Sequence, residues 1–528
     1  MPGTIRGVSA RRRGRHAARS PLPFGAVALV LALVAGAVIV WRLDPWTGEA
    51  NGPAAAGDSP GPSPSPSPSP SESPSPEPSP AASPGPINTA FPGITTFRGN
   101  ATRSYYGQGP VPEDPVVLWR YPAAGSLCSL STNGGETEEW CGTGWTGQPN
   151  VIVGGGGRIE VRVGAYDGNY HFLNGRTGEP VRPQLVTGDL AKGSATSDPD
   201  GYPLYYAGSR DNLFRIVALD RPEPEVLWSM DAQTSVPDPR WNNDWDGAAL
   251  VIGDYLLEGG ENSWFYVIRL NRGYDERGRV TVNPRIVARI PGFDDRLLAD
   301  LPDNDVSIEG SVAFRDGVAY FANSGGLVQG WDISNLLNGG TRYRRVFRFW
   351  TGDDTDASVV IDEEGYLYVG TELQRFNARS ADVGQLMKLD PRKPRDPLVW
   401  SVPIPERGGD GLGGVWATPA LYRGMVYEAT NFGDLIGVDR ATGQVRWRIH
   451  LPGPAWSSPV AVDGVLLQGD CAGDLHAFDI SRPRKEPREL WSVHLDGCIE
   501  STPSVFRGMI WVGTRGGGIY GIGDRARS

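Results

Sequence analysis

The feature that most constrains this chain is an internal repeat that runs from about residue 87 to the C-terminus. Each unit consists of short runs of β-forming residues that end at Gly or Asp, which is typical of short antiparallel strands joined by tight turns. The clearest unit comprises residues 416–420, 424–428, 433–439 and 445–447. The same order recurs in residues 456–491, and again in residues 500–521, where the chain stops before a fourth strand.

Upstream, the ending of the third strand and the Trp of the fourth strand both recur at intervals of about 40 to 60 residues. Four short strands per unit at this period are the signature of a propeller blade, so the sequence predicts an all-β, eight-bladed propeller of four-stranded antiparallel blades. The third-strand endings are Asn174, Asp220, Asn271, Asp332, Asp390, Asp439, Asp479 and Asp524, and the fourth-strand Trp residues are Trp228, Trp350, Trp400, Trp447 and Trp491.

One strand of the fourth type is left over at the start of the repeats. Residues 115–122, around Trp119, match the fourth strands but have no first three strands before them, whereas the last unit lacks its fourth strand. We therefore predict that this N-terminal strand completes the C-terminal blade, closing the ring so that no sheet edge remains exposed.

Residues 439–447, with the pattern Asp-x-x-Thr-Gly-x-x-x-Trp, resemble the tail of the pyrroloquinoline quinone (PQQ) repeat. The start of the repeat region, Phe97 to Arg103 followed by Val117 to Arg120, is similar to the way such propellers often begin. The resemblance implies the eight-bladed fold shared by quinoprotein alcohol dehydrogenases and BamB-like proteins, with Trp residues wedged between neighbouring blades.

The resemblance does not carry the cofactor with it. Quinoprotein dehydrogenases hold the quinone between a Trp and a vicinal disulfide, beside a calcium ion bound by carboxylate and amide groups. This chain has no adjacent Cys pair, and it has no Cys-x-x-Cys-His for attached haem. We therefore expect no cofactor, and PQQ with calcium only if the protein is an unorthodox quinoprotein.

The N-terminal region predicts a membrane anchor and a spacer. Five arginines between residues 11 and 19 precede an uncharged, mostly apolar stretch at residues 20–41 that is long enough to span a bilayer. We expect a cytoplasmic basic tail (1–21), a signal-anchor helix (22–42), a disordered Pro/Ser-rich stalk (43–86) and the propeller (87–528) outside the cell membrane. A cleaved signal peptide is the alternative.

The charge distribution excludes some partners. The net charge is −11, but the first 21 residues carry six Arg and no acid, so the rest of the chain carries −17. An acidic body of this kind argues against nucleic acid as a partner.

The four cysteines are even in number and lie in the segment expected to be outside the cell, which favours disulfides. Cys128 and Cys141 lie in the connection into the first blade. Cys471 lies in a loop between second and third strands, and Cys498 lies in the connection into the next blade. We predict the pairs Cys128–Cys141 and Cys471–Cys498 out of three possible connectivities.

The starts of the innermost strands predict which side chains line the mouth of the central channel. Carboxylates and indoles that converge there could bind a cation, an amine or a sugar. Alternatively, they simply stay solvated in a water-filled mouth. The candidate ligand-binding residues are Trp145, Asp246, Glu309, Asp356, Trp416, Trp456 and Glu500.

No catalytic or metal site is predicted. The sequence contains no Gly-x-Ser-x-Gly and no His-Glu-x-x-His, and the acidic run at residues 353–356 is either a calcium-binding segment or a blade connector. We expect a membrane-anchored, non-catalytic binding or scaffolding module for an envelope protein or glycan. The alternative is a PQQ- and calcium-dependent oxidoreductase that uses Trp416 or Trp456 as a stacking platform.

Overall fold

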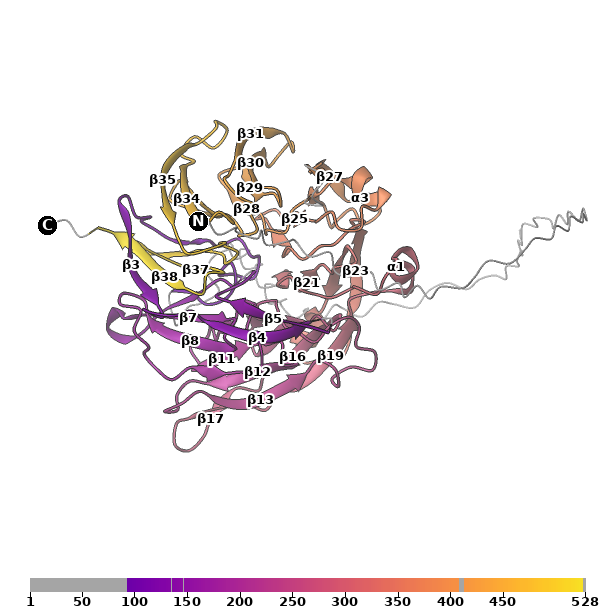
Figure 1. Ribbon diagram of the computed structural model, residues 1–528. Coiled ribbons are helices and arrows are strands. Elements are labelled where there is room, and N and C mark those ends of the chain that lie inside the picture. Colours follow the sequence, from indigo (N-terminus) through magenta and orange to yellow (C-terminus); the bar gives the residue numbers. More distant parts are fainter. Residues whose placement is uncertain (1–92, 134, 146, 408–412, 526–528) are drawn as a thin grey trace, which may run out of the picture. The chain divides into compact units, whose positions relative to one another are not determined.

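A computed structural model describes residues 93–133, 135–145, 147–407 and 413–525, which belong to one compact unit. Eight sheets, antiparallel apart from one short parallel pair, are arranged as the blades of a propeller around a common axis (Figure 1), so the predicted eight-bladed fold is confirmed. The predicted tail, signal-anchor helix and stalk lie outside the described residues. Among the residues described, no helix has the length and apolarity needed to cross a membrane.

The first four blades follow one another along the chain. Blade 1 contains β1 (Gly93–Ile94), β6 (Asn150–Val153), β7 (Ile159–Ala165), β8 (Asn169–Asn174) and β9 (Leu185–Val186). Blade 2 contains β10 (Thr196–Ser197), β11 (Leu204–Ala207), β12 (Leu213–Ala218) and β13 (Glu225–Asp231). Blade 3 contains β14 (Leu250–Ile252), β15 (Tyr255–Gly259), β16 (Trp264–Arg269) and β19 (Arg285–Pro291). Blade 4 contains β20 (Ala313–Arg315), β21 (Val318–Phe321), β22 (Leu327–Asp332) and β23 (Arg344–Trp350).

The next three blades repeat this order, and the eighth combines both ends of the repeat region. Blade 5 contains β24 (Val360–Ile361), β25 (Leu367–Gly370), β26 (Leu386–Leu389) and β27 (Leu398–Val402). Blade 6 contains β28 (Ala420–Tyr422), β29 (Met425–Ala429), β30 (Asp434–Asp439) and β31 (Val445–His450). Blade 7 contains β32 (Val460–Val462), β33 (Val465–Gly469), β34 (Asp474–Asp479) and β35 (Arg488–His494). Blade 8 contains β2 (Gly107–Gln108), β36 (Ser504–Phe506), β37 (Met509–Gly513), β38 (Ile519–Asp524) and β3 (Pro115–Tyr121).

Ring closure follows the prediction from the unmatched strand. Strand β3 pairs antiparallel with β38, and Trp119 lies opposite Gly521. The Trp119 indole is buried and donates a hydrogen bond to the carbonyl oxygen of Gly175 in blade 1. The N-terminal strand therefore completes blade 8 and also joins it to blade 1.

The Asp-x-x-Thr-Gly-x-x-x-Trp pattern has a packing explanation. The Asp439 carboxylate accepts hydrogen bonds from the backbone and hydroxyl of Thr442, which fixes the turn after β30. Gly443 has a φ of 73°, and a Cβ there would lie 2.7 Å from Trp400 of blade 5. Trp400 in turn donates to the carbonyl oxygen of Arg440. The turn formed by this motif therefore packs against the Trp of the preceding blade.

Residues 93–108, which we call the N-terminal strap, were not predicted to have a structural role. The strap makes hydrogen bonds to seven blades, at the innermost strand or at residues beside it. In the remaining blade, blade 7, Tyr106 of the strap belongs to a core cluster that includes residues of that blade. Because it contacts all eight blades, it must lie across the axis of the ring. Its side chains Arg98 and Arg103 are fully buried.

Short elements decorate the blade connections. Both predicted disulfides, Cys128–Cys141 and Cys471–Cys498, are present. The two-stranded hairpins are β4 (Cys128–Asn133) with β5 (Glu136–Cys141), and β17 (Gly273–Tyr274) with β18 (Val280–Thr281). The helices are α1 (Asp295–Asp300), α2 (Ser334–Leu337), α3 (Ala378–Val383) and the 3-10 turn η1 (Gly155–Gly157).

Candidate functional site

A belt of small and hydroxyl side chains holds neighbouring blades together around the axis. The backbone N–H of one blade donates to the hydroxyl of the next, as between Ser311 and Ser358, between Ser358 and Thr418, and between Thr418 and Ser458, with distances of 2.8, 3.0 and 2.9 Å. In each blade, the residue two positions before the belt residue occupies an equivalent place. These eight, which we call the ring residues, are Trp145, Lys192, Asp246, Glu309, Asp356, Trp416, Trp456 and Glu500.

Three of the ring residues form an aromatic cluster. Trp145 and Trp416 stack with ring centroids 5.5 Å apart and an interplanar angle of 14°. Trp456 meets Trp416 edge to face at 5.4 Å. Trp145 is buried, with 5% of its surface exposed, whereas Trp416 and Trp456 are partly exposed. Because blades 1 and 6 are not neighbours, this contact shows that the indoles meet over the axis.

The indole N–H groups of Trp145 and Trp416 are buried without a hydrogen-bond partner in the described part of the chain. A buried indole N–H usually finds an acceptor. The aromatic cluster therefore offers two donors together with partly exposed aromatic surface.

The ring residue of blade 2, Lys192, was missed by the sequence analysis. Its ammonium lies 2.9 Å from Asp244, 2.8 Å from Asp246 and 3.1 Å from Glu261. Burial alone would lower the pKa of Lys192, but the three carboxylates raise it well above its ordinary value. One ammonium cannot neutralise three carboxylates, and burial together with Asp244 raises the pKa of Asp246 well above its usual range.

A second acidic group lies between blades 4 and 5. Carboxylate oxygens of Asp354, Asp356 and Glu372 lie within 4.8 Å of one another, and all three residues are buried. Neither carboxylate oxygen of Asp354 accepts a hydrogen bond, and Arg375 Nη1 lies 3.8 Å away while also facing Asp303, Asp305 and Asp353. Burial and the neighbouring Asp356 raise the pKa of Asp354 well above its ordinary value.

The remaining acidic ring residues are also buried and bonded. Glu309 and Asp356 accept hydrogen bonds from Ser307 and Ser324, each at 2.8 Å. Glu500 pairs with Arg515 at 3.2 Å, although burial still raises the pKa of Glu500.

The structure therefore brings the predicted indoles together but distributes the predicted carboxylates over separate buried clusters. The interpretation that the acidic side chains stay solvated in a water-filled mouth is wrong, because Asp246, Glu309, Asp356 and Glu500 are all buried. Asp246 pairs with Lys192 and Glu500 pairs with Arg515, whereas Glu309 and Asp356 both accept a hydrogen bond from Ser324.

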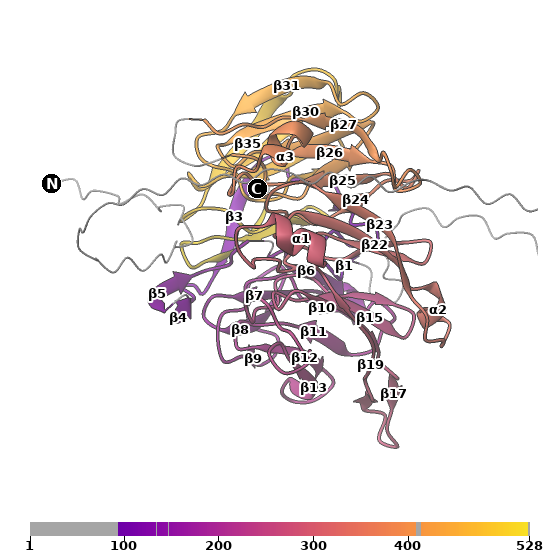
Figure 2. The ribbon, with the colours of Figure 1, turned by 90° about the vertical axis from the view of Figure 1, so that its right-hand side faces the viewer.

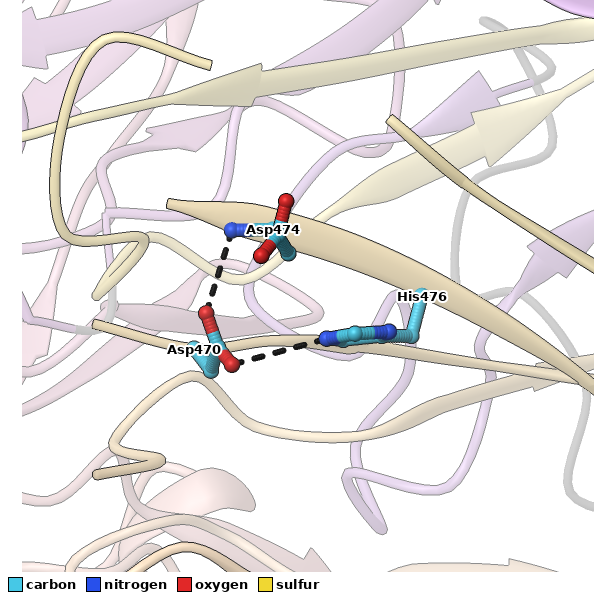
Figure 3. A group of neighbouring side chains, drawn as sticks. All are labelled: Asp470, Asp474 and His476. Carbon is cyan, nitrogen blue, oxygen red and sulfur yellow. Dashed lines mark hydrogen bonds and ion pairs between the residues drawn. The ribbon is translucent and has the colours of Figure 1, made fainter. Parts of the chain in front are cut away.

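Other polar groups show no catalytic arrangement. Figure 3 shows Asp470 accepting hydrogen bonds from the backbone N–H of Asp474 and from His476 Nε2, at 3.0 and 3.4 Å. The other nitrogen of His476 contacts Glu489 at 2.7 Å. In residues 93–525, with the gaps given above, the imidazoles have carboxylate partners rather than hydroxyl ones, and every cysteine is in a disulfide.

Replacing Asp354 with Asn is expected to stabilise the fold more at pH 8 than at pH 5. A carboxylate whose folded pKa is raised contributes stability that is present below its unfolded pKa and is lost as the pH rises through the folded pKa. Removing the charge should therefore raise the free energy of unfolding at pH 8 by about 1–3 kcal/mol, measured by urea denaturation.

Asp353→Asn is the matched control, because Asp353 accepts backbone hydrogen bonds from residues 354, 375 and 376 and its replacement should destabilise the protein. A loss of stability for Asp354→Asn at both pH values would contradict this account of the cluster.

Comparison with known proteins supports the fold. A family model described as outer membrane protein assembly factor BamB matches residues 383–522. The BamB of Nitrosomonas eutropha (strain DSM 101675 / C91 / Nm57) is 26% identical over 141 residues, which are 27% of this chain and 32% of that protein. The match thus spans about a third of the relative's length.

Solved structures resemble a larger part of the chain. A europium-containing methanol dehydrogenase matches with a TM-score of 0.54 and 13% identity, over 81% of this chain and 90% of that one. The quinohemoprotein alcohol dehydrogenase of Comamonas testosteroni matches with 0.53 and 12%, over 83% and 81%. The BamB of Moraxella catarrhalis matches with 0.48 and 15%, over 69% and 93%. At these identities, the two matches above 0.5 show a shared fold.

Proposed function

We propose that this propeller is a non-catalytic binding and scaffolding module that presents its partly exposed ring residues Trp416 and Trp456 to a protein or glycan of the cell envelope. In this proposal, residues 22–42 anchor the chain in the cell membrane with a cytoplasmic N-terminus, and the Pro/Ser-rich residues 43–86 hold the propeller outside. The fold alone does not carry this function, because propellers host many unrelated activities.

The observation that carries the proposal is the cluster of Trp145, Trp416 and Trp456 over the axis. Large, partly exposed aromatic side chains with polar groups still to be satisfied are typical of binding hot spots. Buried arginines of the strap bond to the carbonyl oxygens of Ala248, Val312 and Thr418, two or three residues after ring residues, which holds the backbone beside the ring in place.

The family match lends support, because residues 383–522 include Trp416, Trp456 and Glu500. The name of that family describes a factor for assembly of outer membrane proteins, which is a scaffolding role in an envelope.

The test is capture of envelope components by the full-length protein and by the Trp416→Ala, Glu500→Gln variant. Capture should be lost in the variant. Because Glu500 is buried and pairs with Arg515, its replacement should also lower the free energy of unfolding, so Glu500→Gln alone is the control for stability. Leu130→Ala, at an exposed side chain outside the ring residues, serves as the control. Equal capture by the variant would remove the ring residues from the binding surface.

A PQQ- and calcium-dependent oxidoreductase is the second candidate, and two observations bear on it. Asp354, Asp356 and Glu372 offer carboxylate oxygens of the kind that calcium prefers. The quinone fits less well, because Trp416 is stacked on Trp145 and also contacts Trp456, and the sequence has no adjacent Cys pair to form the clamp.

Addition of PQQ with calcium separates the two candidates. The binding module predicts no change in visible absorbance and no thermal stabilisation at saturating cofactor. Stoichiometric quinone binding with turnover of an alcohol would replace the first proposal by the second.

A further inference from the structure

The hairpin of β4 and β5 is the described element least explained by the propeller itself. It lies in the connection from blade 8 to blade 1, and Figure 2 shows it standing out from one side of the ring, at the left of the view. Its two strands pair only with each other, and the disulfide Cys128–Cys141 joins them at the end opposite the turn, next to the ring.

One face of the hairpin is fixed to the ring. The Ser129 hydroxyl donates to the carbonyl oxygen of Tyr166 at 2.5 Å, and the Trp140 indole meets the Tyr166 ring edge to face at 5.6 Å. The Arg515 guanidinium lies 5.1 Å from the Trp140 ring centroid and donates to the carbonyl oxygen of Cys141 at 3.1 Å. The hairpin is therefore a rigid platform rather than a free loop.

The other face and the edges are open. Leu130 is 71% exposed, and Thr132, Thr137 and Glu139 are also exposed. The Cα atoms of Cys128 and Cys141 are 4.1 Å apart, which is the spacing of a pair that exchanges no backbone hydrogen bonds. By alternation, Glu139 and Thr137 lie in the same kind of pair, so they direct their backbone N–H and C=O groups away from β4, toward the free edge of β5.

This free edge is protected against strand pairing by negative charge alone. Natural proteins guard exposed edges with charged side chains, Pro, bulges or very short strands. Strand β5 has six residues, three of them Glu, contains no Pro and pairs with β4 in continuous register. Like charges disfavour pairing with a second copy of this edge, whereas strand addition by a basic segment meets no such barrier.

The charge of the hairpin indicates the partner. Glu139 is exposed on the open face of the hairpin, and residues 128–141 contain no Lys or Arg. Side chains directly opposite each other on paired strands lie close enough for charge pairs to contribute. A strand that carries Lys or Arg is therefore favoured beside β5, and an acidic one is disfavoured.

We propose that the free edge of β5 is a docking strand for an extended, Lys- or Arg-containing segment of a protein partner. The inference rests on the proposed binding function and names the chemical class of one partner. It concerns a surface separate from the aromatic cluster, so the two can be tested independently.

The probe is a fluorescent ten-residue peptide of alternating Val and Lys, added to the full-length protein with its disulfides intact and followed by fluorescence anisotropy. A second peptide is N-methylated at every residue, which removes the backbone donors of both strand edges but keeps the charge. A third carries Glu in place of Lys. We expect the N-methylated peptide to bind at least about tenfold more weakly than the parent, and the Glu peptide not to bind measurably.

Two matched pairs of variants locate the site. Thr137→Pro removes the outward N–H without removing a bond to β4 and should weaken the parent peptide about tenfold. Thr137→Val loses the same hydroxyl contact with Thr132 but keeps the N–H, so it should bind normally. Glu139→Lys should weaken binding more than Glu139→Gln does.

Equal affinity for the N-methylated peptide, normal binding by Thr137→Pro, or no binding of the parent peptide would each overturn the inference. The Trp416→Ala variant, which leaves the Glu500–Arg515 pair intact, should still bind the parent peptide. If the peptide fails to bind while envelope capture depends on the ring residues, the docking strand is wrong and the proposed function is unaffected.

Discussion

Replacing Arg103 with Ala is expected to lower the free energy of unfolding by about 3–5 kcal/mol, the scale found when one partner of a buried charged network is removed. The Arg103 guanidinium donates to the carbonyl oxygens of Phe97, Ala248 and Val312 at 2.8, 2.9 and 2.8 Å, and to the hydroxyl of Thr96 at 3.0 Å. It therefore ties the strap to blades 3 and 4. Burial lowers the pKa of Arg103 to about 9, although the buried Glu258 opposes this shift.

The loss of stability in Arg103→Ala should be local as well as global. The backbone N–H groups of Phe314 and Ile361 donate to the strap residues Ala101 and Thr102, at 2.7 and 3.0 Å. In the variant, these two amides should exchange with solvent faster than the amides in the middle of their blades.

Urea denaturation and hydrogen exchange measure these two effects. Arg103→Lys keeps the charge but loses the planar fork of donors, so it should show an intermediate loss. Arg277→Ala, at an exposed position between β17 and β18, should change stability by less than about 0.5 kcal/mol. A loss below about 1 kcal/mol for Arg103→Ala would contradict the role given to the strap.

Replacing Trp119 with Ala should cost about 3–5 kcal/mol, as expected for removal of a large buried aromatic side chain. Trp119 packs against Gly178 and Gly521, where an added Cβ would lie 2.6 and 2.1 Å from the indole. The loss also removes the hydrogen bond to Gly175 across the junction of blades 8 and 1. Because β3 supplies the outer strand of blade 8, the variant should release the N-terminal strand and be cleaved faster by protease near residues 115–121.

The control lies on the same strand. Leu118 is largely exposed, so Leu118→Ala should leave both unfolding and proteolysis nearly unchanged. If Trp119→Ala behaves like Leu118→Ala, then closure of the ring does not depend on this strand.

Most of the architecture could be predicted from the sequence because each blade repeats the same local chemistry. Three features are visible in the residues: the Asp-x-x-Thr-Gly turn, the Trp that packs on it, and the missing fourth strand of the last unit. Together they predicted the eight blades and the closing strand. The strap was missed for a physical reason. Residues 95–103 combine hydroxyl, Gly, Asn and Arg side chains without apolar periodicity, and two fully buried arginines run against the usual pattern of burial.

The candidate site was predicted in part. Trp145, Trp416 and Trp456 do meet, because equivalent positions of a closed ring point toward one axis. Lys192 occupies the same position in blade 2 and could have been found by aligning all blades on the hydroxyl belt. The burial of Asp354 and its cluster could not have been predicted, because it depends on how the loop before β24 and the loop after β25 pack against each other.

The most direct test of the binding surface is site-specific photo-crosslinking in intact cells. The photoreactive residue p-benzoylphenylalanine replaces Trp456, in the aromatic cluster, or Tyr274, an exposed residue of the hairpin that connects β16 to β19. The account predicts a discrete adduct with an envelope component at position 456 and none at position 274. Adducts of equal yield at both positions, or an adduct at position 274 alone, would contradict it.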